Sequence, residues 1–387
     1  MQTSSHWTHS KGKARNNSGP TAAFRDRKVK YMRRKTAISL FSGAGGLDVG
    51  FEKAGFQILF ANEFDHDAAC TWRSNRQSNS AAMSEGDITE KLSELTQFHG
   101  MIDVLFGGPP CQGFSVAGKM DPNDARSKLI FTFLKAVQIV EPKIFVMENV
   151  KALGTLERWA DIRNRFLSQA SDLGYNVGYS VFHTADFGVP QKRDRVIFIG
   201  VKAGTPQNFF ASMKKQTCPA PKTRDVLRSV GAFGSEQNPD TCAATITLAR
   251  SPIMRKSPYA GMLVNGAGRP VDLDGLPPTL PATMGGNKTP IVDQRALEDE
   301  TIVNWFEDYH KKIVAGDCVP ATMEIPDFIR RLTLREAAAI QTFPTDYTFC
   351  GARNKQYRQI GNAVPSLFAY KIAIALCAAY PNAFSLA

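Results

Sequence analysis

The chain has 387 residues, of which 43% are hydrophobic, and these values fit a globular protein of two or three domains. No uninterrupted apolar run reaches the roughly 18 residues that a membrane span needs. The closest run, Val364 to Tyr380, is interrupted by Ser366 and Lys371. The seven cysteines are scattered without a CxxC pair, which argues against a zinc site or a disulfide framework. We therefore expect a cytoplasmic protein with free thiols and no metal.

The net charge of +11 is concentrated near the N-terminus. Residues 1–35 contain ten Lys or Arg and one Asp, so the rest of the chain is close to neutral. A polar, basic segment with few apolar side chains cannot offset the entropy lost on ordering, and we expect a disordered arm. Such an arm is either a solvated tail or a contact for phosphates, and its composition does not separate the two.

From Thr36 onward, short runs rich in β-branched residues alternate with stretches of helical periodicity. This alternation is typical of a doubly wound α/β fold with a mostly parallel sheet. After residue 201, loops rich in Pro, Gly, Ser and Thr predict a second domain that extends to about Pro326. A helical sequence resumes at Arg331. Strands are predicted at 36–41, 57–62, 102–106, 143–149, 175–182 and 195–201, and helices up to Gly55, from Asp65, at 129–140, at 297–314 and at 364–380.

The first predicted strand leads into a glycine-rich turn, Phe41 to Gly46, with the sequence FSGAGG. Glycines let a ligand approach the backbone, although a turn without a ligand explains about half of such matches. Glu63 ends the next strand, 18 residues beyond Gly45, where a carboxylate can accept hydrogen bonds from both ribose hydroxyls. The turn lacks the Lys of a triphosphate-binding loop, so a nucleoside without a triphosphate is favoured. Asp87 either accepts a hydrogen bond from an adenine amino group or caps a helix, and both are about equally favoured.

A later strand leads directly into GGPPCQGFS, Gly107 to Ser115. This sequence places Cys111 on a loop at the carboxyl edge of the sheet, where doubly wound folds bind ligands, and two prolines stiffen the backbone before it. A lone cysteine is usually a small buried hydrophobe, but the nearby glycine-rich turn favours a nucleophile here. A thiolate can add to the electron-poor carbon 6 of a pyrimidine.

Two charged motifs are predicted at the same edge. The apolar strand at 143–149 ends in Glu148 and Asn149, and the position of this acid favours a function over a solvated strand end. Such an acid can contact ring nitrogen 3 and the exocyclic amine of cytosine, which thymine lacks. Alternation places Arg193 and Arg195 on one face, where two guanidiniums suit a carbonyl oxygen or a phosphate. Taken alone, this pair is more simply an exposed strand start.

Together, the motifs resemble those of the cytosine-5 DNA methyltransferases. FSGAGG, NEFD, GDI, PPCQGFS, MENV, QKRDR, RRLTLREAAAIQTFP and QIGNAVPS stand in the order found in that family, with a weaker match at PPTLPATMGGN. The resemblance covers residues 36–201 and 331–367. It implies a Rossmann-like, S-adenosylmethionine-dependent catalytic domain at 36–202, completed by 329–387, and a target-recognition domain at 203–328. Candidates for DNA contacts in that domain, to either bases or phosphates, are Arg250, Arg255, Lys256 and Arg269.

The resemblance also implies which residues act. Cys111 is the covalent nucleophile and Glu148 supports ring nitrogen 3. Arg195 holds the base carbonyl, while Arg193 assists or binds phosphate. Thr279 matches a position that holds the DNA backbone beside the displaced cytosine. The S-adenosylmethionine pocket is expected to be lined by Phe41, Gly43, Gly45, Gly46, Glu63, Asp87, Ile88, Pro110, Leu129, Asn362 and Val364.

The implied enzyme flips a cytosine out of duplex DNA and methylates its carbon 5, either within a restriction-modification system or as a solitary methyltransferase. We expect a compact prokaryotic monomer at the nucleoid, and any cognate endonuclease would act on the same site without a stable complex. A tRNA methyltransferase would share PPCQ and ENV, but the Cys-Phe-Thr tripeptide of those enzymes is absent. Enzymes that methylate exocyclic amines carry an aromatic residue in place of Cys111. An inactive DNA-binding module is disfavoured because Cys111 and Glu148 are both present.

Overall fold

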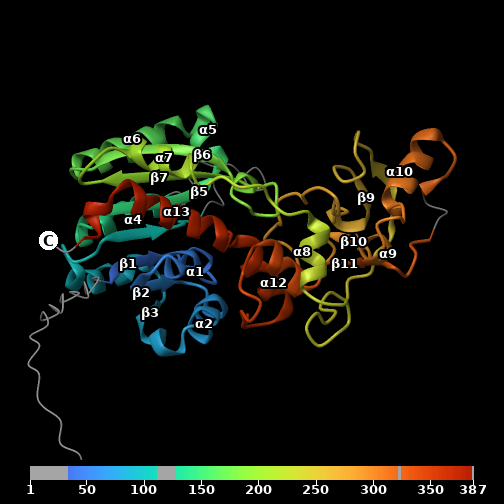
Figure 1. Cartoon of the computed structure of the whole chain (residues 1–387), viewed down its shortest axis with the longest axis horizontal. Helices are drawn as coiled ribbons and strands as arrows, with labels where there is room; N and C mark the ends of the chain where they lie inside the picture. The colour runs from blue at the N-terminus through green and yellow to red at the C-terminus, as the bar shows by residue number, and fades with distance from the viewer. Residues whose placement is uncertain (1–33, 111–127, 321–323, 386–387) are drawn as a thin grey trace, which may run out of the picture. The chain divides into compact units, whose positions relative to one another are not determined.

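A seven-stranded sheet lies at the centre of the computed structural model, which describes residues 34–110, 128–320 and 324–385 (Figure 1). The strands are β1 Lys35–Leu40, β2 Phe56–Glu63, β3 Met83–Glu85, β4 Val104–Gly107, β5 Ile144–Val150, β6 Asn176–His183 and β7 Asp194–Val201. Their order is β3-β2-β1-β4-β5-β7-β6, with β1 to β5 parallel and β7 antiparallel to both neighbours. The predicted doubly wound, mostly parallel sheet is confirmed, and the structure adds the short strand β3.

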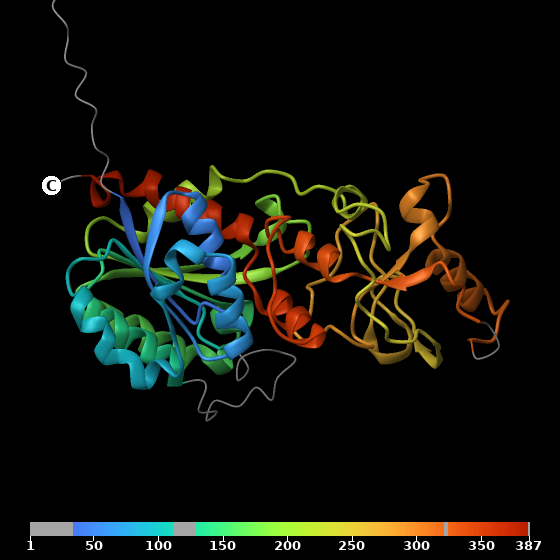
Figure 2. The ribbon, with the colours of Figure 1, turned by 90° about the horizontal axis from the view of Figure 1, so that it is seen from below.

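Alternate residues of each strand pack against different helices, because successive side chains point to opposite faces of a sheet. On β5, Ile144 and Val146 belong to one core, and Phe145 and Met147 belong to the other. Helices therefore cover both faces of the sheet (Figures 1 and 2). The first core is covered by α1 Gly46–Lys53, α7 Pro206–Lys214 and α13 Ser366–Ala379, and the second by α4 Leu129–Val140 and α6 Ala160–Asp172.

Shorter elements complete the described part of the chain. Two further sheets have two antiparallel strands each, which pair β8 with β9 (Leu248–Ile253, Met262–Val264) and β10 with β11 (Ile291–Asp293, Ile329–Arg331). The remaining α-helices are α2 His66–Ser74, α3 Ile88–Lys91, α5 Lys151–Thr155, α8 Thr223–Ser229, α9 Gln294–Glu298, α10 Trp305–Ala315, α11 Leu334–Ile340 and α12 Arg353–Asn362.

One predicted helix is divided in the structure. The sequence predicts a helix over 297–314, but α9 ends at Glu298 and α10 begins at Trp305. Asp293 contributes to both elements: its Oδ1 caps the start of α9, and its Oδ2 accepts a hydrogen bond of 2.8 Å from the backbone N–H of Trp305. Asn304 caps the start of α10. These local side-chain bonds satisfy the free N–H groups of a second helix start, so one continuous helix does not form.

Two contacts cross the predicted domain boundaries. The strand β10 pairs with β11, on the other side of the boundary predicted at residues 328 and 329. Phe209 and Met213 of α7 pack into the sheet core beside α13, although the sequence assigns α7 to the second domain. The described residues accordingly form one compact unit.

The stretch Arg353–Ala379, which includes α12 and α13, is long and apolar enough to cross a membrane by length and composition. However, 67% of its most apolar window is buried inside the protein. The buried side chains of α13 pack with those of α1 and α7 against the sheet. This stretch is therefore enclosed by protein, as expected for a core helix.

Candidate active site

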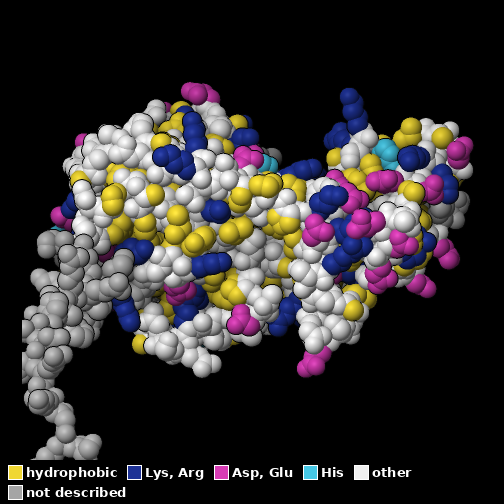
Figure 3. Space-filling view, in the orientation of Figure 1, with side chains coloured by type: hydrophobic (Ala, Val, Ile, Leu, Met, Phe, Trp, Pro, Cys, Tyr) yellow, Lys and Arg dark blue, Asp and Glu magenta, His cyan; other side chains and the backbone are white. Residues whose placement is uncertain are grey.

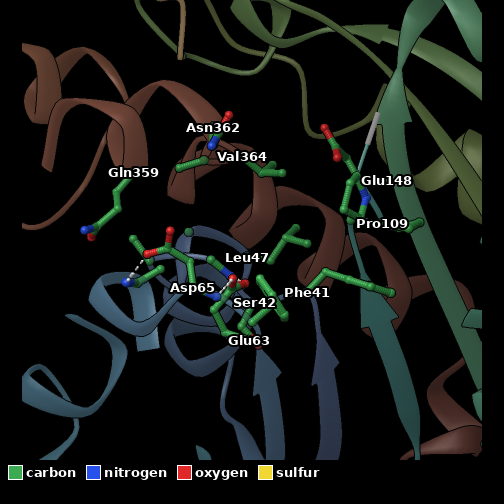
Figure 4. Close-up of a pocket in the computed structure, with 18 of the residues that line it drawn as sticks. Phe41, Ser42, Leu47, Glu63, Asp65, Pro109, Glu148, Gln359, Asn362 and Val364 are labelled. Carbon is green, nitrogen blue, oxygen red and sulfur yellow. Dashed lines mark hydrogen bonds between the residues drawn. The ribbon is translucent and has the colours of Figure 1, made fainter. Parts of the chain in front are cut away.

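A cavity of about 500 Å³ opens at the carboxyl ends of the parallel strands, where the strand order reverses between β1 and β4. Doubly wound folds bind ligands at this switch point. Figure 4 shows side chains from the loop after β1, from the end of β5 and from α12 around the same space. The cavity is lined by these predicted residues: Phe41, Gly43, Gly46, Glu63, Asp87, Ile88, Pro110, Leu129, Glu148, Arg195, Asn362 and Val364.

The turn after β1, residues 42–46, is here called the glycine loop. The backbone is left-handed at Phe41 (φ 54°), Gly43 (φ 55°) and Gly45 (φ 84°), which is costly for a bulky residue such as Phe41. A Cβ added at Gly46 would lie 2.4 Å from the carbonyl oxygen of Val364, so only glycine allows this close approach. The loop and the segment after α12 therefore form one wall of the cavity, although 318 positions separate Gly46 and Val364 in the sequence.

Glu63 lies at the end of β2, directly under the glycine loop (Figure 4). Its Oε2 accepts a hydrogen bond of 2.8 Å from the N–H of Gly43, and its Oε1 accepts one of 2.8 Å from the N–H of Asp65. Burial raises the pKa of the Glu63 carboxyl, and these backbone bonds oppose the shift. A carboxylate offers about four acceptor positions, so each oxygen can accept a further hydrogen bond from a ligand.

Asp87 is a helix cap in the structure and also lines the cavity. Its Oδ1 accepts hydrogen bonds of 2.8 Å from both the backbone N–H and the hydroxyl of Thr89, at the start of α3. The capping alternative from the sequence is therefore confirmed. It does not exclude a ligand contact, because Asp87 lines the same space as Glu63 and Ile88.

Glu148 and Arg195 form an ion pair at the other end of the cavity, with 2.6 Å between Oε1 and Nε. Glu148 is 8% exposed, and neither side chain exceeds 13% exposure. The antiparallel pairing of β5 with β7 sets Arg195 opposite Val150, diagonally across from the acid. A Cβ added at Gly108 would lie 3.1 Å from Oε2 of Glu148, so the acid lies against the backbone that leads toward Cys111.

Cys111 itself lies outside the described residues. The described residues on both sides of its segment, Pro110 and Leu129, line the cavity. Asn149 donates a hydrogen bond of 3.2 Å to the carbonyl oxygen of Pro109 and so ties the end of β5 to this loop. The described chain therefore stops at Pro110 and resumes beside Leu129, and both of these residues line the same cavity as Glu148.

Arg193 is buried beside the segment after α12 and is absent from the described lining of the cavity. Its Nη2 donates hydrogen bonds to the carbonyl oxygens of Gly361 (3.2 Å) and Ala363 (2.9 Å). This placement corrects the expectation of a base or phosphate contact, because the guanidinium is 1% exposed and is used for backbone carbonyls. Arg193 precedes β7, so strand alternation alone does not determine its surroundings.

Thr279 and Gly45 also lie beside the cavity rather than in its lining. The Thr279 hydroxyl donates a hydrogen bond of 2.7 Å to the carbonyl oxygen of Lys192, and the Lys192 N–H donates one of 2.9 Å to Pro277. The segment that contains Thr279 is therefore docked against the residues just before β7. Gly45 faces away from the cavity, toward Arg76 and Tyr347.

The sequence did not single out several residues of the cavity wall. Phe64 is 76% exposed although it is a large apolar side chain, and it follows Glu63 directly. Arg358 forms an ion pair with Asp65 across the cavity mouth. An aromatic residue directly after the strand-end acid was an available signal for Phe64, whereas no local pattern links Asp65 with Arg358.

The cavity wall combines two kinds of surface. Leu47, Ile88, Leu129 and Val364 give it an apolar side, and carboxylates lie at its base and rim. A nucleoside needs such a combination, because the flat base packs on apolar side chains while the ribose hydroxyls donate to a carboxylate. The residues present therefore fit a nucleoside-type cofactor.

Comparisons with known proteins agree with this geometry. The family model described as C-5 cytosine-specific DNA methylase matches residues 35–378. The Type II methyltransferase M1.HphI of Haemophilus parahaemolyticus is 32% identical over 358 residues, which cover 89% of this chain and 87% of that protein. The Type II methyltransferase M.NgoPII of Neisseria gonorrhoeae is 32% identical over 359 residues, which cover 88% and 94%. A protein encoded within an E. coli prophage shares the fold, with a TM-score of 0.59, 24% identity and coverage of 88% and 98%.

Proposed function

The chain belongs to the C-5 cytosine-specific DNA methylases, and we propose that it transfers a methyl group from S-adenosylmethionine to carbon 5 of a flipped-out cytosine in a specific duplex site. The observation that carries this proposal is the cavity itself. It joins the half-buried acid Glu63 under the glycine loop to the Glu148–Arg195 ion pair beside the loop that leads to Cys111. A methyl donor and a base can thus be held in one enclosed space.

The cofactor would be held at the end of the cavity that contains the glycine loop. Glu63 would accept both ribose hydroxyls, and Asp87 would accept the adenine amino group through Oδ2, since Oδ1 caps α3. Phe64, Ile88 and Val364 would pack around the base. When bound, S-adenosylmethionine supplies an electrophilic methyl group.

The base would be activated at the end of the cavity that contains Glu148. The Cys111 thiolate adds to carbon 6, forming a carbon–sulfur bond and moving the electron pair of the double bond into the ring. Glu148 supports ring nitrogen 3, where that charge collects, and Arg195 holds the base carbonyl through Nη2, because its Nε pairs with Glu148 and its Nη1 donates to the carbonyl oxygen of Asp194. After carbon 5 takes the methyl group, water accepts the proton of carbon 5, the C–H electron pair re-forms the double bond between carbons 5 and 6, and the carbon–sulfur bond breaks to release the thiolate.

We propose that Arg193 holds the cavity wall that would contact the cofactor, and that it does not contact the base. Its guanidinium holds the carbonyl oxygens on either side of Asn362, and Gln341 donates to the Ala363 carbonyl as well (3.1 Å). Asn362 lines the cavity. This contact couples the motif before β7 to the C-terminal wall, so Arg193 has a positioning role.

The partner would be duplex DNA, bound by the proposed target-recognition domain at residues 203–328. Figure 3 shows Lys and Arg interspersed with Asp and Glu on the visible face of the described residues, as expected where the charge outside the N-terminal arm is nearly balanced. Site-specific contacts with DNA are therefore assigned to individual exposed Lys and Arg side chains. The predicted candidates Arg250, Arg255, Lys256 and Arg269 are all exposed, and Thr279 would hold the DNA backbone beside the displaced cytosine.

We further propose a cytoplasmic monomer that modifies DNA in a restriction-modification system or as a solitary methyltransferase. Relatives named as Type II methyltransferases support this proposal. A cognate endonuclease would act on the same DNA site without a stable complex.

The proposal is tested by transfer of a labelled methyl group from S-adenosylmethionine to plasmid DNA, followed by bisulfite sequencing. The expected result is label in the DNA and methylcytosine at one recurring sequence. Glu148→Gln should reduce the transfer rate by about 10²–10⁴-fold, the range of a positioned acid or base, whereas the exposed Glu157→Gln should leave it unchanged. Label in tRNA alone, or a wild-type rate in Glu148→Gln, would refute the proposal.

A further inference from the structure

A buried cluster of polar side chains lies against the glycine loop on the side away from the cavity. A Cβ added at Gly45 would lie 2.9 Å from Nη1 of Arg76 and 2.9 Å from the hydroxyl oxygen of Tyr347. Arg76 follows α2, and Tyr347 lies between α11 and α12, so two distant parts of the chain meet behind the loop. The cluster touches the loop but contributes nothing to the described cavity lining, and the proposed reaction does not use it.

The contacts in this cluster form a continuous chain. Glu52 of α1 accepts a hydrogen bond of 2.8 Å from Nε of Arg76, and Nη1 of Arg76 donates one of 3.1 Å to the Tyr347 hydroxyl. The Tyr347 hydroxyl in turn donates to the carbonyl oxygen of Ala44, within the loop. The guanidinium also stacks over the ring of Trp72, 4.7 Å from its centroid. The Tyr347 hydroxyl therefore connects the glycine loop to the buried guanidinium of Arg76.

Burial fixes the protonation states that these contacts need. Arg76 is 7% exposed and Tyr347 is 5% exposed. Burial raises the pKa of Tyr347 to about 12, so its hydroxyl remains a donor at neutral pH. Burial opposes the charge on Arg76, but the surrounding Tyr347, Asp48 and Glu52 outweigh it and raise the pKa of the guanidinium. At neutral pH the Arg76 guanidinium is thus charged, and the Tyr347 hydroxyl keeps its proton and can donate a hydrogen bond.

Asp48 shows that this cluster is not optimised for stability. It is completely buried, and burial raises the pKa of its carboxyl. Its Oδ1 accepts a hydrogen bond of 2.9 Å from the indole N–H of Trp72, but Oδ2 has no hydrogen-bond partner within the described part of the chain. A buried oxygen without a partner costs free energy and calls for another explanation.

We propose that Tyr347 and Arg76 are positioning residues for the cofactor, which hold the glycine loop from behind in its ligand-binding conformation. The inference rests on the proposed binding of S-adenosylmethionine in the cavity. The left-handed backbone at Phe41, Gly43 and Gly45 persists only where surrounding contacts fix it, and the Tyr347–Ala44 bond is such a contact. The C-terminal part of the chain therefore sets cofactor affinity through a residue that does not touch the cofactor.

The test compares Tyr347→Phe with Tyr357→Phe. Tyr357 is a matched control: it is fully buried in the same core, and its hydroxyl also has two partners, the backbone carbonyl of Leu332 (2.7 Å) and the Thr241 hydroxyl (2.8 Å), neither of them in the loop. Binding of S-adenosylhomocysteine is measured by calorimetry, and hydrogen exchange is followed in the peptide that contains residues 42–46. We expect Tyr347→Phe to raise Kd about tenfold and to speed exchange in the loop, because it removes the hydrogen bond to the Ala44 carbonyl and the one accepted from Arg76. Tyr357→Phe should change neither.

Urea unfolding of both variants separates positioning from general loss of stability. Arg76→Lys provides a second test, because lysine keeps the charge near Glu52 but loses the planar fork that reaches Tyr347. It should weaken binding in the same direction. Wild-type Kd and exchange in Tyr347→Phe, or equal changes in Tyr357→Phe, would overturn the inference. If the wild-type protein binds no S-adenosylhomocysteine, the proposed function fails instead.

Discussion

Glu63 lies half-buried under the glycine loop, where desolvation raises the pKa of its carboxyl above the ordinary value. The native protein therefore holds the proton on Glu63 more tightly than the unfolded chain does. Its contribution to stability is present below the unfolded pKa and is lost as the pH rises through the folded pKa. A ligand that donates hydrogen bonds from two hydroxyls needs the ionised form of Glu63. Ligand binding therefore strengthens as the pH rises through the pKa of Glu63, whereas the contribution of Glu63 to stability weakens.

This linkage predicts that affinity for S-adenosylhomocysteine falls as the pH is lowered, and that it does so at a higher pH than for a glutamate of ordinary pKa. Glu63→Gln should bind more weakly and lose this pH dependence, because the amide does not titrate. Calorimetric titrations between about pH 5 and 7 measure both effects. An identical pH dependence in Glu63→Gln would assign the titration to another group.

Two of the predicted residues that line one cavity have positions that follow from a local pattern. Glu63 and Glu148 each end an apolar strand, and parallel strands bring such ends to one edge of a sheet. Tyr347 and Arg193 were not predicted in their observed surroundings. Their partners, the carbonyls of Ala44 and Ala363, lie 303 and 170 positions away in the sequence, and contacts of backbone carbonyls leave no residue pattern.

At the scale of elements, the packing of α1 on α13 joins the two ends of the catalytic domain. The closest approach is at Gly50, where an added Cβ would lie 2.4 Å from Cβ of Ala369 and 2.4 Å from the backbone nitrogen of Tyr370. The apolar pattern at 364–380 predicted a helix, which the structure confirms as α13. It did not predict which helix would cover it, because any apolar face satisfies such a pattern.

Gly50→Ala should therefore destabilise the protein by about 1–3 kcal/mol, because overpacking outweighs the better helix propensity of alanine. Gly286→Ala is the matched control, since an added Cβ there meets nothing within 4 Å. Midpoints of urea unfolding measure the difference. Equal midpoints for the two variants would show that α1 and α13 accommodate the added methyl group without loss of stability.

Helix caps determine where the predicted helix over 297–314 is interrupted. The apolar periodicity over 297–314 continues through the break between α9 and α10, so a periodic pattern alone predicts one helix there. Asp293 and Asn304 supply competing helix starts, and the bond from the Trp305 N–H to Asp293 spans twelve positions. Short-range capping rules identify Asn304, whereas the second role of Asp293 depends on the fold.

At the scale of the whole molecule, the chain leaves the sheet after α7 and returns to it in α13. The core around Leu280, Leu297 and Tyr347 combines residues from the proposed target-recognition domain with the C-terminal helices. The same C-terminal part supplies Asn362 to the cavity and Tyr347 to the glycine loop. Contacts that the proposed target-recognition domain would make with DNA are thus connected to the proposed cofactor wall through one continuous core.

The central claim is that Cys111 attacks a flipped cytosine in duplex DNA, and trapping the covalent complex tests it most directly. The protein is incubated with S-adenosylmethionine and a mixed-sequence duplex that contains 5-fluorocytosine, whose fluorine cannot leave as a proton does, and adducts are separated on a denaturing gel. The variant Cys318→Ala, at a half-buried cysteine, serves as the thiol control. We predict a stable adduct for the wild-type protein and for Cys318→Ala, and none for Cys111→Ala. An undiminished adduct in Cys111→Ala, or an adduct with tRNA alone, would contradict the account.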